Sequence, residues 1–274
     1  MSASAAPSVV EFERVSFAFD DHVILRDVSF TVPRGSMTIL LGESGVGKSV
    51  TLKLILGLLR PDSGSIRVNG ERVDTMSEQE LMRVRADIGM VFRELALFDS
   101  LTVAENVGYR LSEEMRLPNH QVRERVEDVL GFIGLGEFVD RMPSALSGGQ
   151  RRRVAIARAM APKPSLILFD DPTTGLDPII ASTVDDEIVK LRDLEHVTSI
   201  FVTQQIRDAF YIATHHAVRR DGQIEILETP EEVAPAEFLV LHNADIRFRG
   251  SAPALLESQD EYLRQFLYMT LPPW

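Results

Sequence analysis

The amino-acid sequence predicts an α/β fold in which buried strands alternate with helices and a helical segment is inserted into the core. Two short apolar runs, 37–41 and 166–169, have the length and near-continuous hydrophobicity of buried strands. The first run leads through a glycine-rich loop into a helical pattern, and the second ends in two aspartates. Between about 93 and 162 the apolar residues recur at helical spacing instead, which predicts the insert.

The bulk properties of the chain limit its function classes. Its 274 residues are 45% apolar, which is enough for a substantial core, and its formal net charge is -12. With a pI near 5.0 the chain lacks the basic character of nucleic-acid-binding proteins, so we expect no nucleic-acid partner. The chain has no cysteine, which excludes disulfides and thiolate metal sites. No apolar run approaches the ~20 residues that span a bilayer. Residues 1–8 do not resemble a signal peptide, so we expect a protein that is soluble or held at a membrane by a partner.

The first part of the chain carries strand and turn signals in close succession. Alternating apolar residues predict a strand at 9–19, and a second strand is expected at 24–32 after a turn at 20–22. Asn69-Gly70 between two short apolar runs is a strong hairpin signal. Further predicted elements are strands at 37–41 and 88–92, a helix at 50–59, and a helix at 78–84 that opens with the capping-box pair Ser77 and Glu80.

The helical insert and the return to the core follow. Thr102 and Glu105 have capping-box spacing, and Asn119 is expected to cap a helix whose apolar residues share one face. The stretch 226–244 has no assignment. Elements predicted after the insert are strands at 166–169 and 199–202, a helix between them at 178–192, short strands to about 248, and a helical stretch at 252–267.

The glycine-rich loop matches the phosphate-binding P-loop pattern G-x-x-x-x-G-K-[ST]. Its glycines let the backbone turn sharply and approach a polyphosphate, and the N–H groups at the start of the next helix form an anion site. Lys48 offers a positive charge for the β- and γ-phosphates, and Ser49 offers a hydroxyl ligand for Mg²⁺. The predicted nucleotide-binding residues of this loop are Gly42, Glu43, Ser44, Gly45, Val46, Gly47, Lys48, Ser49 and Val50.

A second motif lies where the strand at 166–169 ends. Asp170 and Asp171 follow four apolar residues, so they are expected at the carboxyl edge of the sheet, where ligands bind in α/β proteins. Asp170 is placed to hold Mg²⁺, as the acidic strand end of P-loop enzymes does, and Asp171 is then next to the γ-phosphate. The sequence therefore predicts a nucleotide and Mg²⁺ at this edge.

The stretch Leu146-Ser147-Gly148-Gly149-Gln150 points to the family. Ser147 is expected to be the N-cap of a helix that runs to Met160, and the glycine N–H groups make a second anion site. One molecule does not need two γ-phosphate sites, but two molecules arranged head to tail do, because each offers this loop to the other's nucleotide. With the P-loop upstream and the acidic strand downstream, the chain resembles the ATP-binding cassette (ABC) ATPases from about residue 9 to residue 250.

The resemblance implies an α/β P-loop NTPase core of the RecA-like type with an antiparallel β subdomain and an inserted α-helical subdomain. It also implies that ATP and Mg²⁺ bind, that the protein is a homodimer, and that the signature residues Ser147, Gly148, Gly149 and Gln150 contact the partner's nucleotide. The implied layout is an ABC ATPase domain at 8–250, made of a core at about 8–92 and 163–250 and a helical subdomain at about 93–162, with a helical tail at 251–274.

Family roles transfer where the residues match. Phe19 occupies the position of the aromatic that stacks on adenine, and the alternative of a core strand aromatic stays open. Asp177 matches the D-loop, which touches the partner subunit. Three catalytic positions depart from the family: Arg93 replaces the Q-loop glutamine, Asp171 the general-base glutamate, and Gln204 the switch histidine. These departures predict hydrolysis at a reduced rate.

Four stretches are similar to one branch of the family, the MlaF-like ATPases: 96–107, 175–179, 207–210 and 264–267. Those ATPases serve transporters that move phospholipids between bacterial membranes, with a permease and a substrate-binding MCE protein. The resemblance therefore implies a protein at the cytoplasmic face of the inner membrane, peripheral through a permease and working with an MCE-type lipid-binding protein.

The helical insert is expected to carry the permease contact. Leu95, Leu97, Phe98 and Leu101 are more apolar than a solvated loop requires, and ABC permeases dock a short helix beside the Q-loop. The alternative is that these residues pack within the insert.

Two other functions stay open at this point. The three departures are compatible with a degenerate cassette that binds ATP and dimerises with little hydrolysis. A soluble ABC ATPase of DNA repair or translation is the second alternative. The acidic pI, the single cassette and the short segment 50–146, which leaves no room for a long coiled-coil arm, argue against it.

Overall fold

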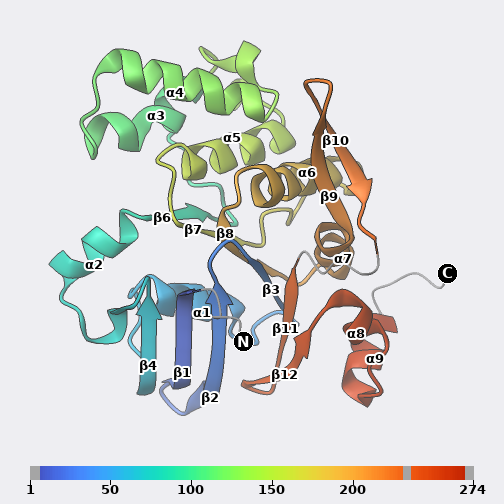
Figure 1. Ribbon diagram of the computed structural model, residues 1–274. Helices are drawn as coiled ribbons and strands as arrows, with labels where there is room; N and C mark the ends of the chain where they lie inside the picture. Colours follow the sequence, from blue (N-terminus) through green and yellow to red (C-terminus); the bar gives the residue numbers. More distant parts are fainter. Residues whose placement is uncertain (1–6, 231–235, 269–274) are drawn as a thin grey trace, which may run out of the picture.

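The computed structural model describes residues 7–230 and 236–268, and Figure 1 shows how their helices and strands are arranged. These residues form a six-stranded sheet in the order β12-β11-β3-β8-β7-β6, a four-stranded sheet in the order β2-β1-β4-β5, and the β10-β9 pair. The strands are β1 (Ser8–Phe19), β2 (His22–Pro33), β3 (Met37–Leu41), β4 (Ser63–Val68), β5 (Glu71–Arg72), β6 (Ile88–Val91), β7 (Leu166–Asp170), β8 (Thr198–Thr203), β9 (His215–Arg220), β10 (Gln223–Glu228), β11 (Glu237–His242) and β12 (Asp245–Gly250). The helices are α1 (Lys48–Ile55), α2 (Glu78–Arg85), α3 (Val103–Glu113), α4 (Asn119–Phe132), α5 (Gly148–Met160), α6 (Pro178–Leu194), α7 (Ile206–Thr214), α8 (Ala252–Leu256) and α9 (Glu261–Tyr268).

The six-stranded sheet is parallel except at one edge. The neighbouring pairs from β11 to β6 run parallel, and β12 joins β11 antiparallel. The carboxyl ends of parallel strands meet at one edge of a sheet. The segments that follow β3, β6, β7 and β8 therefore converge there, which brings the P-loop, Arg93, the aspartate pair and Gln204 to one place.

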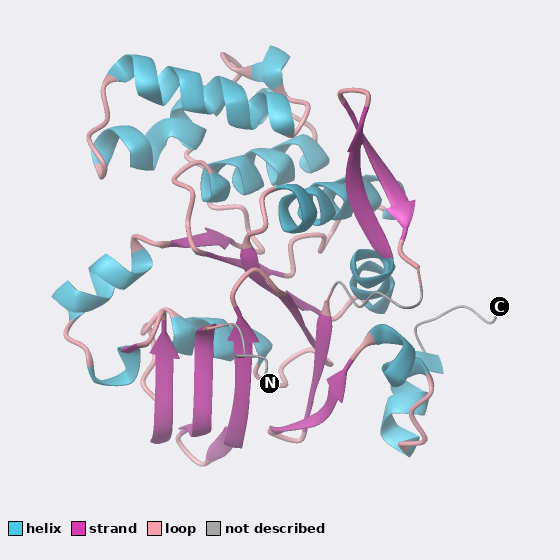
Figure 2. Cartoon of the chain, viewed as in Figure 1, coloured by secondary structure: helices cyan, strands magenta, loops and turns pink. Residues whose placement is uncertain are grey.

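Both faces of this sheet are covered, because alternate strand residues are apolar on each side. Leu40 and Leu168 belong to the hydrophobic cluster that includes α1 and the four-stranded sheet. Ile39 and Phe169 belong to the cluster that includes α5 and α6. Figures 1 and 2 show these two groups of elements on opposite sides of the central sheet. The P-loop helix and the signature helix are thus separated by the sheet in one chain.

The helical insert forms a lobe of α3, α4 and α5 between β6 and β7, seen in green at the top of Figure 1. The apolar face expected on α4 is confirmed, because Val126, Val129 and Leu130 are buried. The capping boxes expected at Ser77 and Thr102 are also formed. Asn119, however, is the first residue of α4 rather than its N-cap, because Pro118 occupies the N-cap position with an extended ψ of 143.

The helix after the P-loop is shorter than expected, ending at Ile55 instead of residue 59. Gly57 adopts a left-handed φ of +63, and a Cβ there would lie 2.5 Å from Leu81 Cδ2. A glycine in this conformation terminates a helix, and here it also allows α2 to approach closely.

The C-terminal part completes the central sheet. β11, whose residues fall in the unassigned stretch 226–244, inserts between β12 and β3. The predicted helical tail forms α8 and α9 as far as Tyr268. Residues 231–235 of the unassigned stretch and 269–274 of the tail lie outside the described residues. Within the described ranges, no helix combines the length and the apolar character needed to cross a membrane.

Candidate nucleotide-binding site

The P-loop lies between β3 and α1 and closes around the side chain of Lys48. The Lys48 ammonium donates hydrogen bonds to the carbonyls of Gly42 and Glu43 at 2.8 and 2.7 Å, and the residue is only 6% exposed. Gly47 has a φ of +108, and a Cβ there would lie 2.8 Å from the side chain of Ile24. The turn therefore requires glycine, and the loop forms a cradle around a cation that suits phosphate oxygens.

The charged residues predicted for the site meet around this lysine. Burial lowers the pKa of Lys48, the carboxylates of Asp171 and Asp170 raise it, and the Arg93 guanidinium lowers it. The structure thus brings four sequence-predicted residues into electrostatic reach of one another. The two acids favour the charged ammonium, which is the form that binds phosphate.

Ser49 and Asp170, the two residues predicted to hold Mg²⁺, are in direct contact. The Ser49 hydroxyl donates to Asp170 Oδ1 at 2.8 Å. Burial raises the pKa of Asp170, and the neighbouring Asp171 raises it further. The hydrogen bond from Ser49, which is the second-largest effect, and the charges of Arg93 and Lys48 lower the pKa of Asp170. The described residues contain no group of three or more His, Cys, Asp or Glu side chains that would hold a metal alone. A hydroxyl and one carboxylate fit Mg²⁺, which binds few protein oxygens and takes its other ligands from phosphates and water.

Asp171 lies at the junction of β7 and β8. It is buried, and its N–H donates to the carbonyl of Val202 at 2.9 Å. Its carboxylate accepts a hydrogen bond from the N–H of Gln204 at 3.1 Å. Asp171 also has a φ of +46, a left-handed conformation that is uncommon for a residue with a side chain and is found at functional sites. The predicted base and switch residues are therefore in direct contact.

Phe19 ends β1 with its ring 49% exposed. Its ring meets the ring of the buried Phe17 edge-on, with the two ring centroids 4.8 Å apart. The alternative of a core aromatic is therefore wrong, and the ring is available for a ligand.

A cavity of about 540 Å³ opens beside the P-loop, and sequence reasoning missed part of it. Its lining includes Ser44, Gly45 and Val46 of the loop, His22, Val23, Ile24 and Arg26 of β2, and Asn243 and Ala244 of the β11–β12 turn. The turn is fixed there because the N–H of Arg26 donates to the carbonyl of Ala244 at 2.7 Å. No local pattern identifies such a contact between distant segments.

The signature loop begins α5 with the expected cap. The Ser147 side chain accepts from the N–H of Gln150 at 3.2 Å, and the Gln150 side chain accepts from the N–H of Ser147 at 2.8 Å. A Cβ at Gly149 would lie 2.4 Å from Ile180 Cγ2. Asp177 caps α6 by accepting from the N–H groups of Ile179 and Ile180, each at 3.1 Å. The signature loop thus packs on the segment that carries the predicted D-loop residue.

Sequence comparison finds transporter subunits. Residues 25–174 match the ABC transporter family. The Fe(3+) ions import ATP-binding protein FbpC of Photorhabdus laumondii is 36% identical over 265 residues, which cover 94% of this chain and 72% of FbpC. The sulfate/thiosulfate import ATP-binding protein CysA of Mycobacterium tuberculosis is 40% identical over 225 residues, 81% of this chain and 62% of CysA. The intermembrane phospholipid transport system ATP-binding protein MlaF of Escherichia coli is 36% identical over 260 residues, 95% of this chain and 88% of MlaF.

Solved structures share the fold. CbiO1 from Clostridium perfringens, part of an ABC transporter complex, has a TM-score of 0.77 at 26% identity and covers 97% of this chain and 96% of its own. The ATP-binding cassette MJ0796, in a dimeric post-hydrolysis state bound to ADP and Pi, has a TM-score of 0.71 at 27% identity and covers 88% of this chain and 98% of its own.

These comparisons confirm the ABC ATPase fold, ATP and Mg²⁺ as ligands, and dimerisation as the family's mode of assembly. They do not single out MlaF, since iron and sulfate importers are comparably similar. The chain belongs to the ABC transporter family, as the ATP-binding, ATP-hydrolysing subunit that works with a membrane permease.

Proposed function

We propose that this ATPase energises the movement of phospholipids between bacterial membranes, from the cytoplasmic face of the inner membrane. Its partners in the proposal are a permease and an MCE-type lipid-binding protein. The observation that carries the proposal is the extent of the match to MlaF, which covers 88% of that protein, against 72% of FbpC and 62% of CysA.

The proposed chemistry assigns a task to each residue at the sheet edge. Lys48 exchanges its hydrogen bonds to two loop carbonyls for bonds to phosphate oxygens. Ser49 and Asp170 hold Mg²⁺, which when bound neutralises charge on the phosphates. Asp171 orients the attacking water and accepts its proton, and the Gln204 amide donates to the γ-phosphate without carrying charge.

In the proposed dimer, Ser147, Gly148, Gly149 and Gln150 bind the nucleotide held by the P-loop of the partner. The sheet that separates α1 from α5 in one chain supports this arrangement. Phe19 stacks on the adenine, for which its exposed ring is suited.

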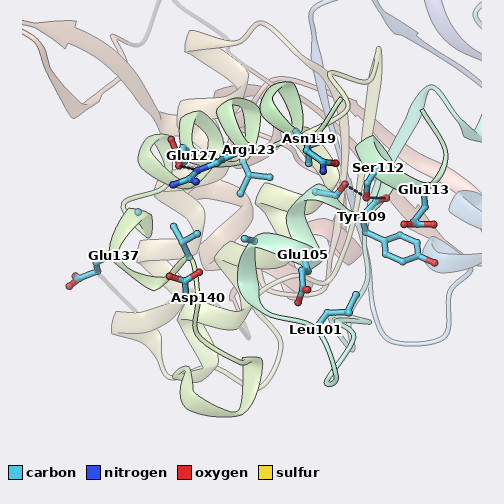
Figure 3. Close-up of a pocket in the computed structure, with 16 residues that line it drawn as sticks. Leu101, Glu105, Tyr109, Ser112, Glu113, Asn119, Arg123, Glu127, Glu137 and Asp140 are labelled. Carbon is cyan, nitrogen blue, oxygen red and sulfur yellow. Dashed lines mark hydrogen bonds and ion pairs between the residues drawn. The ribbon is translucent and has the colours of Figure 1, made fainter. Parts of the chain in front are cut away.

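We further propose that the permease docks on the helical insert. A cavity of about 950 Å³ opens between α3 and α4, and Figure 3 shows acidic side chains from several elements around it. These acidic residues are Glu105, Glu113, Glu127, Glu137 and Asp140. One basic side chain, Arg123, is among the lining residues, and it is paired with Glu127 at 2.8 Å. This charge favours a short permease helix with basic residues.

The four apolar residues expected at this contact divide into two groups. Leu95 and Leu97 are partly buried and pack against the core, as the alternative expected. Phe98 is 37% exposed and lies 4.7 Å from the Tyr109 ring, and Leu101 lines the cavity. Phe98 and Leu101 are thus the residues available to the permease.

The substrate is tested on the complex purified from native membranes through a tag on this chain. We expect the permease and an MCE-type protein to co-purify, and added phospholipid, but not Fe³⁺ or sulfate, to raise the rate of ATP hydrolysis. The same complex carrying Lys48→Ala controls for contaminating ATPases. Stimulation by Fe³⁺ or sulfate, with the matching binding protein in place of the MCE-type protein, contradicts the proposal.

A further inference from the structure

One buried arginine of the signature helix holds two other motif segments. Arg152 on α5 is 7% exposed, and its guanidinium donates to the carbonyls of Phe92 at 3.4 Å, of Arg93, and of Thr174 at 2.8 Å. Phe92 and Arg93 follow β6, and Thr174 follows β7. The signature helix is therefore tied through a single side chain to the segments that carry Arg93 and Asp171.

The register of the sheet places Arg93 at the phosphate edge. β6 pairs in parallel with β7, and Val91 lies opposite Phe169. The next residues of β6, Phe92 and Arg93, therefore leave the sheet alongside Asp170 and Asp171. The Arg93 side chain is exposed, and the Arg152 hydrogen bond to its carbonyl fixes the backbone from which it projects.

Arg152 has no carboxylate partner among the residues that the structure describes. The hydrogen-bond partners found for Arg152 among the described residues are main-chain carbonyls, and its buried Nε has no partner there. Burial lowers the pKa of Arg152, and Arg93 lowers it further. Arg93 also acts in the same direction on the pKa of Lys48, where burial is the larger cause. Arg93 is repelled by both Arg152 and Lys48, and although Asp170 and Asp171 favour the charge of Lys48, an anion bound beside Arg93 relieves that repulsion.

We propose that the Arg93 guanidinium binds the γ-phosphate of ATP and that Arg152 is the positioning residue that holds Arg93 there. The chain then supplies from Arg93 the positive charge that Gln204 is unable to carry. Arginine is suited to this task because its planar guanidinium donates two parallel hydrogen bonds to a phosphate. The inference rests on the proposed nucleotide site and assigns the part of it that distinguishes ATP from ADP.

The test is the selectivity for the γ-phosphate, measured as the ratio of the dissociation constants for Mg–ADP and a non-hydrolysable Mg–ATP analogue. The full-length chain is titrated calorimetrically as wild type and as Arg93→Gln, Arg93→Lys, Arg152→Lys and Arg152→Gln. We expect Arg93→Gln to weaken binding of the ATP analogue by about tenfold to a hundredfold, the usual effect of losing a charge-assisted hydrogen bond. The affinity for ADP should stay unchanged. Arg93→Lys should keep part of the selectivity for the ATP analogue over ADP, because lysine keeps the positive charge but lacks the planar guanidinium.

Both Arg152 variants are expected to reduce the same ratio of dissociation constants, although in the proposal Arg152 itself does not contact the nucleotide. Arg153→Gln is the matched control, because Arg153 lies on the same helix and donates to a carbonyl, that of Ile133 at 3.2 Å, inside the insert. It should leave the ratio unchanged. Urea unfolding of each variant identifies any loss of fold, and the exposed Arg93 keeps the test decisive if an Arg152 variant does not fold.

Equal effects of Arg93→Gln on both nucleotides, or no effect on either, overturn the inference. A normal ratio in folded Arg152 variants overturns the positioning role. If the proposed nucleotide site itself is wrong, the titration gives a different result, because the wild type then binds neither nucleotide.

Discussion

The N–H of Gln204 donates a hydrogen bond to Asp171 Oδ1 at 3.1 Å and so joins the end of β8 to the end of β7. The Asp171 carboxylate is therefore engaged by the backbone of the residue that stands at the switch position. A buried, short acid held in this way reaches less far toward an attacking water than a glutamate would. We therefore predict slow hydrolysis, which the following substitutions test.

We expect Asp171→Glu to raise the steady-state rate of ATP hydrolysis. The added methylene extends the carboxylate by roughly 1.5 Å. A misplacement of about 1 Å costs on the order of a hundredfold, so an increase of about tenfold or more is expected. Gln204→His should add to the gain, and Asp171→Asn should abolish turnover. A lower rate in Asp171→Glu means that the site is tuned around the shorter acid.

Asp185 gives the stability of the protein a pH dependence. It is 1% exposed, and neither of its carboxylate oxygens has a hydrogen-bond partner among the described residues. Burial raises the pKa of Asp185 well above its ordinary value; Asp208 raises it further, Arg207 opposes this, and Asp186 adds to it. Because the folded-state pKa is the higher one, the stability linked to this carboxyl is complete below the unfolded pKa. It is lost as the pH rises through the folded pKa.

Asp185→Asn removes this titration. We expect the free energy of unfolding of this variant to fall less than that of the wild type as the pH rises from 5 to 8, because the amide does not ionise. Urea unfolding at both pH values measures the difference. An identical pH dependence in wild type and variant contradicts the assignment to Asp185.

Gly149→Ala is expected to weaken ATP-dependent dimerisation. The new Cβ would lie 2.4 Å from Ile180 Cγ2, so either the Ile180 side chain or the signature loop has to shift. Overpacking of this kind costs about 1–3 kcal/mol, which corresponds to about fivefold to 150-fold in the dimer dissociation constant when the shift displaces the loop at the interface. Sedimentation with a non-hydrolysable ATP analogue measures it. The double variant Gly149→Ala/Ile180→Ala should recover ATP-dependent dimerisation. If the single variant dimerises like wild type, the signature loop lies away from the interface.

Charge reversal in the groove of the insert tests the permease contact. Glu137 and Asp140 line the cavity and are exposed, so lysine is tolerated at both positions. We expect the double variant to lose co-purification with the permease while keeping its own nucleotide affinity. Glu124→Lys, an exposed residue of α4 outside the lining, is the matched control. Normal assembly of the double variant with the permease excludes this groove as an electrostatic docking site.

The features that sequence reasoning recovered are those encoded over a few residues. The P-loop, the signature loop and the caps at Ser77, Thr102 and Ser147 each depend on backbone geometry that neighbouring side chains determine. The parallel core followed from continuous apolar runs, because a strand that is buried on both faces needs apolar residues throughout.

The features that sequence reasoning missed depend on contacts between distant segments. Arg152 has no local signal for its hydrogen bonds to Phe92 and Thr174, which only the packing of α5 against two strand ends creates. The place of β11 between β12 and β3 was also unassigned, since strand order is a property of the whole sheet. Leu95 and Leu97 had the composition of a docking site, but both are partly buried and pack against the core.

We propose that the P-loop binds the phosphates of ATP through Lys48, and the substitution Lys48→Ala tests this contact. A calorimetric titration with Mg–ATP is made on the wild type, on Lys48→Ala and on Lys53→Ala, which changes an exposed lysine on the same helix. We expect Lys48→Ala to lower the affinity by about tenfold to a hundredfold, because a charge-assisted contact is lost, and Lys53→Ala to bind like wild type. Unchanged ATP affinity in folded Lys48→Ala would mean that Lys48 does not bind the phosphates.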